Sequence, residues 1–187
     1  MKIGIDISQL AYENTGVANY VSSLVKELVK NGNHEYVLFF SSLRGNIKNQ
    51  ISKIKNTNKK VKIKKFRFPP TVLNLLWNKL HVAPIEWFVG DVDWFITSDW
   101  TEPPVKKAKK ATIIYDLIVY KYPEETDKKI VQTQKRKLKW VKKESDIIFC
   151  ISESSKRDAI EILGLDDKKL SVIYPGTEKV SSIKYEV

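Results

Sequence analysis

The sequence has 187 residues, of which 42% are hydrophobic and 29% charged, a composition typical of one globular domain that argues against a disordered chain. Its 33 Lys and Arg residues against 22 Asp and Glu residues give a net charge of +11, which favours anionic partners such as nucleic acid, anionic lipid or phosphorylated acceptors. No signal peptide is expected, and the apolar stretch 82–89 is far shorter than the roughly 20 residues of a membrane-spanning helix. The single cysteine, Cys150, is expected to be a buried, inert thiol, so we predict a cytoplasmic protein.

Short β-branched runs alternate with helical segments along the chain. In chain order we expect a strand at 2–8, a helix at 17–31, a strand at 35–41, a weakly helical segment at 45–58, a strand at 61–66, a mostly helical segment at 71–89, strands at 94–97 and 111–115, a basic helix at 126–144, a strand at 146–152, a helix at 154–163 and a strand at 170–174. Gly32, Thr126 and Gly164 are the expected helix caps. The alternation predicts an α/β, Rossmann-like three-layer domain with a largely parallel sheet of about seven strands and helices on both faces.

In such sheets ligands bind at the carboxyl ends of the strands, so the loops that follow the strands are the candidate site. Gly16 and Val17 lie where the first strand leads into a helix, and a glycine there lets a phosphate or a sugar oxyanion approach free backbone N–H groups. The alternative is a glycine that only allows a turn. No G-x-G-x-x-G pattern accompanies it, so a dinucleotide fingerprint is absent.

Two later loops carry acidic residues at the same predicted edge. Tyr115 and Asp116 follow the fifth strand, where the carboxylate could bind a substrate hydroxyl or, alternatively, cap a turn. Ser152 and Glu153 follow the sixth strand. Capping is the favoured role for the serine, because the helix that follows begins there, whereas Glu153 is expected to project over the sheet edge.

The sequence predicts no metal site and no bound cofactor. Asp91 and Asp93 form a D-x-D pattern, but Asp93 is expected to begin a strand rather than to bind a metal. His34 and His81 are expected in a turn and inside a helix, without Cys or acidic partners at ligand spacing.

Four segments occur together in an order and spacing that resemble those of a known family. They are Ile3-Gly4-Ile5-Asp6 through Thr15-Gly16-Val17-Ala18-Asn19-Tyr20, then Asp93-Trp94-Phe95-Ile96-Thr97-Ser98 through Pro103-Pro104, then Tyr115-Asp116-Leu117 to Tyr122-Pro123-Glu124, and finally Ile151-Ser152-Glu153-Ser154 with Leu170 to Pro175-Gly176. Across almost the whole chain, this pattern resembles glycosyltransferase family 4, the retaining group of GT-B fold once called group 1.

The resemblance implies a division of roles between two Rossmann-like domains that face a cleft. Residues 1–176 would be the N-terminal, acceptor-side domain and 177–187 an interdomain tail, with the donor-binding domain absent and the chain inactive alone. The partners implied are a nucleotide-sugar, bound through that missing domain, and a glycan or lipid-linked acceptor in polysaccharide or glycoconjugate synthesis.

The resemblance also implies roles for individual residues. Gly16 and Val17 would lie near the donor phosphate. Tyr115, which stands where the family has a histidine, and Asp116 would lie at the reacting sugar as the catalytic pair. As a residue type tyrosine titrates at about 10, so it is poorly suited to proton transfer at neutral pH. Ser152 and Glu153 would line the cleft close to the acceptor.

Other functions remain as alternatives. The chain could be a non-catalytic or complementing half-enzyme that binds an acceptor or a partner subunit, with Tyr115 as its best support. Charge alone supports nucleic-acid binding, without any accompanying motif, so this interpretation is the least favoured. The basic helix at 128–143, with Trp140, could rest on an anionic inner membrane surface. The slightly favoured alternative is a solvated helix with Trp140 in the core.

Overall fold

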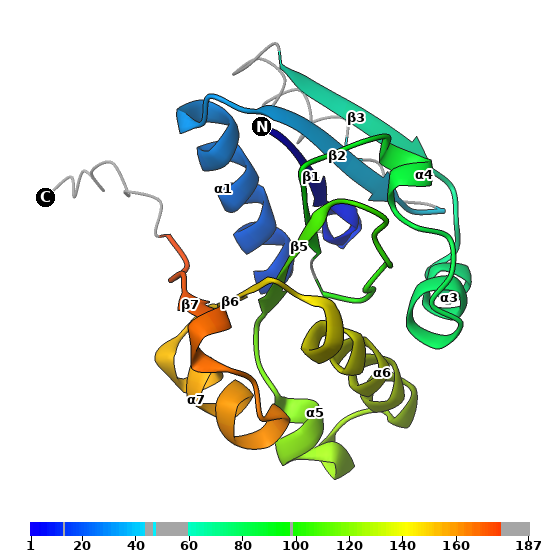
Figure 1. Cartoon of the computed structure of the whole chain (residues 1–187). Helices are drawn as coiled ribbons and strands as arrows, with labels where there is room; N and C mark the ends of the chain where they lie inside the picture. Colours follow the sequence, from blue (N-terminus) through cyan, green and yellow to red (C-terminus); the bar gives the residue numbers. More distant parts are fainter. Residues whose placement is uncertain (13, 44–46, 48–59, 98, 177–187) are drawn as a thin grey trace, which may run out of the picture.

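The computed structural model describes residues 1–12, 14–43, 47, 60–97 and 99–176 (Figure 1). Within them, strands join into one sheet of order β3-β2-β1-β4-β5-β6-β7, and every pairing is parallel. The strands are β1 (Lys2–Asp6), β2 (Glu35–Ser41), β3 (Val61–Phe66), β4 (Trp94–Thr97), β5 (Lys109–Ile114), β6 (Ile147–Cys150) and β7 (Leu170–Val172). The predicted α/β, Rossmann-like fold with about seven strands is confirmed.

Helices fill the connections between these strands. The α-helices are α1 (Gly16–Asn31), α3 (Pro70–Leu73), α4 (Glu86–Val89), α5 (Ile118–Lys121), α6 (Lys128–Glu144) and α7 (Glu153–Leu163). Short 3-10 turns form η1 (Ser8–Ala11), η3 (Pro123–Glu125) and η4 (Asp167–Lys169), and a π-helical segment forms η2 (Asn74–Lys79). In the described part of the chain, no helix is long and apolar enough to cross a membrane.

Helices cover both faces of the sheet, which explains why most of its strands are apolar runs, whereas the edge strand β3 alternates apolar residues with exposed lysines. Ile5 and Leu38 pack on one face in a cluster with Val21 and Val25 of α1. Val37 and Phe39 point to the opposite face, where α3, η2 and α4 cover them with a cluster that includes Trp77. Further along that second face, β5 and β6 pack against α5, α6 and α7.

The segment 71–89 is mostly helical as expected, but it is interrupted, and the placement of His81 inside a helix was wrong. The chain passes from α3 into η2 and then turns sharply before α4, with positive φ angles of 54° at His81 and 62° at Ala83. The indole Nε1 of the buried Trp77 donates a hydrogen bond of 2.9 Å to the Ala83 carbonyl and closes this turn. His81 therefore lies after the helical segment and not inside it.

The helix caps differ from the prediction at one of three positions. Gly164 has the left-handed conformation (φ 61°) and ends α7 as expected. Asp127, and not Thr126, caps α6, because its carboxylate accepts from the amides of Lys129 and Ile130. Gly32 ends α1 in an extended conformation, and the space where its Cβ would lie is taken by Tyr36 and the Leu28 carbonyl. The segments 45–58, apart from residue 47, and 177–187 lie outside the described residues.

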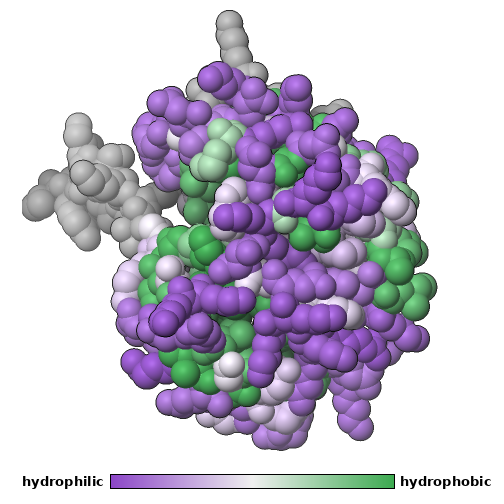
Figure 2. Space-filling view, in the orientation of Figure 1, coloured by the Kyte–Doolittle hydropathy of each residue, from purple (hydrophilic) through white to green (hydrophobic). Residues whose placement is uncertain are grey.

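Hydrophilic side chains cover most of the face shown in Figure 2. The basic helix α6 illustrates the pattern, since all of its Lys and Arg residues except Lys137 are exposed. Most basic side chains of α6 therefore lie in solvent, which agrees with the predicted solvated helix.

Candidate functional site

The carboxyl ends of β1, β4 and β5 border two connected cavities. We call the first the polar pocket; it has a volume of 260 Å³, and its lining includes Val17, Asp99, Tyr115, Asp116, Gln134 and Lys137. The second, the glycine-loop cavity, has a volume of 400 Å³ and is bordered by Gly16, Tyr20, Ile151 and Gly176. Val17, Tyr115 and Asp116 line both, so the two form one crevice at the edge where the sequence predicted it.

The glycine loop, residues 15–17, presents the N-terminus of α1 to this crevice. Thr15 caps the helix, with its Oγ1 accepting a 3.2 Å hydrogen bond from the Ala18 amide. The amides of Gly16 and Val17 precede the first hydrogen bond within the helix, which runs from the Asn19 amide to the Thr15 carbonyl. A Cβ on Gly16 would meet no atom within 4 Å, so the backbone here is open to a ligand. The arrangement can bind an anionic group.

Tyr115 and Asp116 lie between the two cavities. The Tyr115 ring is half-buried and packs edge-to-face on Tyr20, with ring centroids 5.6 Å apart. Asp116 is exposed, and its Oδ1 accepts a 3.1 Å hydrogen bond from the Ile118 amide at the start of α5. The turn-capping role that the sequence left open for Asp116 is therefore present, while the same side chain borders both cavities.

Ser152 and Glu153 lie at the start of α7, beside the crevice. Ser152 is the N-cap, since its Oγ accepts a 3.1 Å hydrogen bond from the Ser155 amide. Ser155 in turn donates a 2.7 Å hydrogen bond to the Tyr115 carbonyl and ties α7 to the end of β5. The glycine-loop cavity is lined by the preceding residue, Ile151. Neither Ser152 nor Glu153 lines it or the polar pocket, and their assignment to the acceptor stays a prediction.

Three polar residues of the pocket were missed from the sequence. Gln134 of α6 donates from Nε2 to both the backbone oxygen and Oδ1 of Asp99, each at 3.1 Å. Lys137, one turn further along α6, is only 2% exposed. Its spacing from Gln134 could have revealed it, because residues 130, 134, 137, 138 and 141 form one stripe of the helix.

The charges of the pocket perturb one another. Burial lowers the pKa of Lys137, and the nearby carboxylates of Glu102, Asp99 and Asp6 oppose this shift. Burial also raises the pKa of Asp99, which Lys137 and the hydrogen bond from Gln134 oppose. A buried ammonium between carboxylates, next to an amide side chain, offers donors and acceptors at fixed positions.

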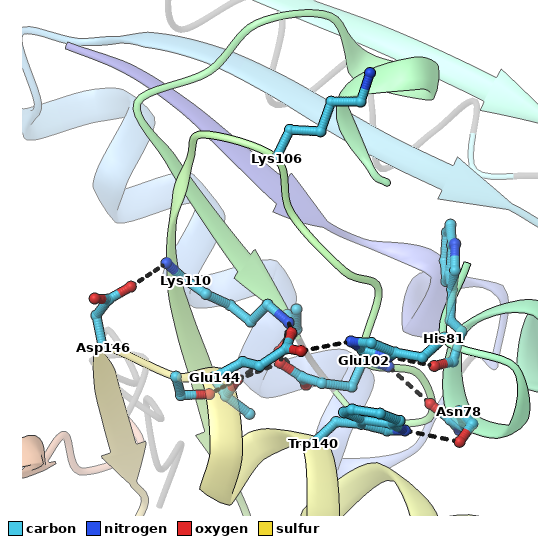
Figure 3. A network of polar contacts seen from close by, with 12 residues as sticks. Asn78, His81, Glu102, Lys106, Lys110, Trp140, Glu144 and Asp146 are labelled. Carbon is cyan, nitrogen blue, oxygen red and sulfur yellow. Dashed lines mark hydrogen bonds and ion pairs between the residues drawn. The ribbon is translucent and has the colours of Figure 1, made fainter. Parts of the chain in front are cut away.

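A buried ion-pair network fixes the loop that carries Asp99 (Figure 3). Glu102 is fully buried and accepts hydrogen bonds from the hydroxyls of Thr97 and Thr112 at 2.8 and 2.9 Å. The ammonium of Lys110 lies 3.6 Å from Glu102 and 2.8 Å from Glu144. The contacts join β4, β5 and α6 directly below the pocket, so its lining is positioned before any ligand binds.

Asn78 links this network to the preceding helical segment. Its Oδ1 accepts from the Glu102 amide at 2.9 Å, and its Nδ2 donates to the Trp100 carbonyl at 2.8 Å. The indole of Trp140 donates a 2.9 Å hydrogen bond to the Asn78 carbonyl (Figure 3). It also stacks on the His81 ring, with ring centroids 3.5 Å apart. Trp140 is thus engaged within the fold, which favours its structural role.

Asp6, at the end of β1, gives the fold a pH dependence. Burial raises the pKa of its carboxyl from 3.8 to about 6, against the hydrogen bonds from Ser8 and the charge of Lys137. The folded chain therefore binds the proton more tightly than the unfolded chain, and the free energy of unfolding falls as the pH rises from about 4 through 6. Two pKa units correspond to about 3 kcal/mol.

We expect the Asp6→Asn variant, whose side chain stays neutral, not to show this fall in the free energy of unfolding with rising pH. Its free energy of unfolding should exceed that of the wild type by more near pH 7 than near pH 4. Urea denaturation at both pH values measures the difference. A stability difference that does not change with pH would contradict the assignment.

The remaining polar candidates lie away from the crevice. The carboxylate of Asp93 accepts a 2.7 Å hydrogen bond from the Lys2 amide at the amino edge of the sheet, which accounts for this residue structurally. Among the described residues, no three His, Cys, Asp or Glu side chains are grouped so as to hold a metal ion. Cys150 is buried, and burial raises the pKa of its thiol to about 11.

Comparison with known proteins gives one family and a fold. The family model described as Glycosyltransferase Family 4 matches residues 14–179. A crystal structure of a glycosyltransferase from Rickettsia africae ESF-5 is similar, with 17% identity and a TM-score of 0.53 over 95% of this chain and 43% of that chain. The structure of apo UGT2 from Phytolacca americana is similar with 11% identity and a TM-score of 0.55, over 94% and 52% of the two chains. The chain thus spans about half the length of either structure, and no protein of curated function matches it significantly.

Proposed function

Because the chain belongs to glycosyltransferase family 4, we propose that it is the acceptor-binding half of a retaining transferase. The complete enzyme would move a sugar from a nucleotide-sugar to a glycan or lipid-linked acceptor in polysaccharide or glycoconjugate synthesis. The observation that carries the proposal is the polar pocket, with Asp99, Gln134 and Lys137 beside the glycine loop. Fixed carboxylate, amide and ammonium groups suit a ligand whose surface consists of hydroxyl groups.

Within this proposal, the glycine loop faces the donor. The amides of Gly16 and Val17 and the N-terminus of α1 would stabilise the negative charge of the leaving diphosphate. Tyr115 and Asp116, between the two cavities, would contact the sugar that is transferred. Ser152 and Glu153 would lie at the acceptor's outer side. No metal or other cofactor is part of the proposal.

Transfer of a labelled sugar tests this function. We would compare the 187-residue chain with the product of the complete reading frame of its gene, using radiolabelled UDP-glucose, UDP-N-acetylglucosamine and GDP-mannose and a panel of glycan acceptors. We expect transfer by the complete product and none by the chain alone, because a nucleotide has no second domain to bind. Transfer by the chain alone would contradict the half-enzyme role, and no transfer by the complete product would contradict the enzymatic function.

A non-catalytic binding role is the second candidate, and Tyr115 is the observation that favours it. Tyrosine stands where the family has a histidine, and its ring packs on Tyr20 as part of the crevice wall. If Tyr115 only shapes the sugar site, the Tyr115→His variant of the complete product should transfer sugar no faster than the wild type. A clear gain in rate would instead indicate that the tyrosine impairs an ancestral activity.

We further propose a cytoplasmic protein that can approach the inner membrane face through its basic surface. The seven exposed Lys and Arg residues of α6 support an electrostatic contact with anionic lipid. Flotation with phosphatidylglycerol vesicles and with neutral phosphatidylcholine vesicles measures it. Equal recovery with both would contradict the membrane contact. Nucleic acid stays the least favoured partner, and its binding would fall steeply with salt.

A further inference from the structure

A second depression adjoins the polar pocket. We call it the apolar groove; it has a volume of 220 Å³, and its lining includes Tyr12, Trp100 and Ile130. Ile130 also lines the polar pocket, and Trp100 directly follows Asp99 of that pocket. The groove and the pocket are therefore adjacent, with Ile130 between them, and a ligand of two ring units can reach from one to the other.

The groove combines aromatic rings with hydroxyl groups. Tyr12 is 47% exposed and Ile130 is 38% exposed. Their apolar surfaces, with the Trp100 indole, are bordered by the side chains of Thr71, Thr101 and Thr133. A pyranose ring has the complementary surface, since its C–H faces are apolar and its rim carries hydroxyls. Asn74 and Lys129 also line the groove, so its polar rim suits a hydroxylated ligand better than a hydrocarbon chain.

The groove is also positioned before a ligand arrives. Asn78, which is 2% exposed, donates a 2.8 Å hydrogen bond to the Trp100 carbonyl and accepts one from the Glu102 amide. Because Glu102 belongs to the buried ion-pair network, the backbone around Trp100 is fixed to the sheet. A backbone that is already fixed at Trp100 reduces the conformational entropy lost when a ligand packs there.

We propose that the apolar groove is a second sugar subsite, so that the acceptor is a glycan of at least two sugar units. This inference rests on the acceptor role proposed above. The acceptor's terminal sugar, which receives the transferred sugar, occupies the polar pocket, and the acceptor's preceding sugar packs on Trp100 and Tyr12. Trp100 is then a residue that determines specificity for acceptor length and takes no part in the chemical step.

Saturation-transfer NMR on the 187-residue chain tests the proposal. The probes are methyl glycosides of glucose, galactose, mannose and N-acetylglucosamine, and the 1,4-linked disaccharides that contain them. We expect the disaccharide that binds best to have an affinity on the order of tenfold above its methyl glycoside, because the second ring buries apolar surface on the aromatic platform. Saturation should reach the protons of both rings.

Trp100→Ala is the decisive variant and Trp87→Ala its matched control. Trp87 is 66% exposed on α4 and lies beside Lys106, outside the groove. In the Trp100→Ala variant, we expect the second ring to lose its saturation while the first ring keeps it, and the length preference to disappear. Trp87→Ala should behave as the wild type, and Trp100→Phe should retain most of the preference.

The outcomes separate this inference from the function on which it rests. Equal affinity for one and two sugar units, or the same loss in Trp87→Ala as in Trp100→Ala, would overturn the second subsite and leave the acceptor role intact. Binding of no glycan in the panel would overturn both. Loss of saturation in both sugar rings of the Trp100→Ala variant, with an unchanged melting temperature, would also overturn the division into two subsites.

Discussion

Replacement of Asp99 by alanine is expected to weaken acceptor binding by roughly 10- to 100-fold, because a hydrogen bond to a charged group contributes about 1.5–3 kcal/mol. Asp99 lines the polar pocket, where Gln134 orients its carboxylate and Lys137 lies nearby. The substitution removes an acceptor of substrate hydroxyls and also leaves Lys137 with less compensating charge. Isothermal titration of the chain with the best glycan of the panel measures the change.

Asp91→Ala is the matched control for this prediction. Asp91 is also an acidic loop residue, but it is exposed and precedes β4, at the opposite edge of the sheet from the crevice. We expect its glycan affinity to equal that of the wild type. If both variants bind alike, the polar pocket is not the acceptor site. Circular dichroism of Asp99→Ala verifies that the loss is not a loss of folding.

The second large effect concerns stability. We expect Glu102→Gln to lower the free energy of unfolding by about 1–3 kcal/mol, because it removes the buried charge that accepts two hydroxyl hydrogen bonds, whereas the Lys110 ammonium keeps Glu144 as its partner at 2.8 Å. Glu102 and Lys110 are both fully buried, and Thr97 and Thr112 donate their hydroxyls to this carboxylate. Glutamine keeps the shape of the side chain but loses its charge, and one of its groups becomes a donor that faces other donors. Urea denaturation near pH 7 measures the loss.

Two further variants make the stability prediction specific. Glu161→Gln, on the exposed side of α7, should change the free energy of unfolding by no more than about 0.5 kcal/mol. The double variant Glu102→Gln with Lys110→Met should not recover the loss, because Lys110→Met also removes the ammonium that pairs with Glu144 at 2.8 Å. A loss below about 1 kcal/mol for Glu102→Gln would show that the network does not fix the pocket loop.

The strands of this fold could be predicted because most are short apolar runs bounded by polar segments, and β3 alternates apolar residues with lysines. β6, for example, is the uninterrupted run Ile147–Cys150, and α7 ends at a glycine whose left-handed conformation the sequence indicated. The break after η2 was missed although Pro84 marks it, since a proline inside a helical pattern ends or kinks the helix before it. The positive φ angles and the contact between the Trp77 indole and the Ala83 carbonyl, which close the turn, have no such signal in the sequence.

The candidate site also contains residues that the sequence indicated and residues that it did not. Gly16, Val17, Tyr115 and Asp116 could be placed at one edge because parallel strands all end there. Asp99 escaped notice because it lies in a loop without periodicity, whose path is set by the buried contacts of Glu102. Lys137 escaped notice because its neighbours along α6 are also basic, although its place in the same stripe as Ile130, Leu138 and Val141 distinguishes it from the exposed lysines.

The central claim is that the crevice at the carboxyl ends of β1, β4 and β5 binds a sugar acceptor. Amide NMR spectra of the ¹⁵N-labelled chain, titrated with the glycan panel, test it most directly. The account predicts that the shifted amides gather at 16–18, 99–101, 115–118 and 130–137, around the polar pocket and the apolar groove. Shifts confined to the opposite edge, at 91–94 and 106–109, or no shifts with any glycan, would contradict it.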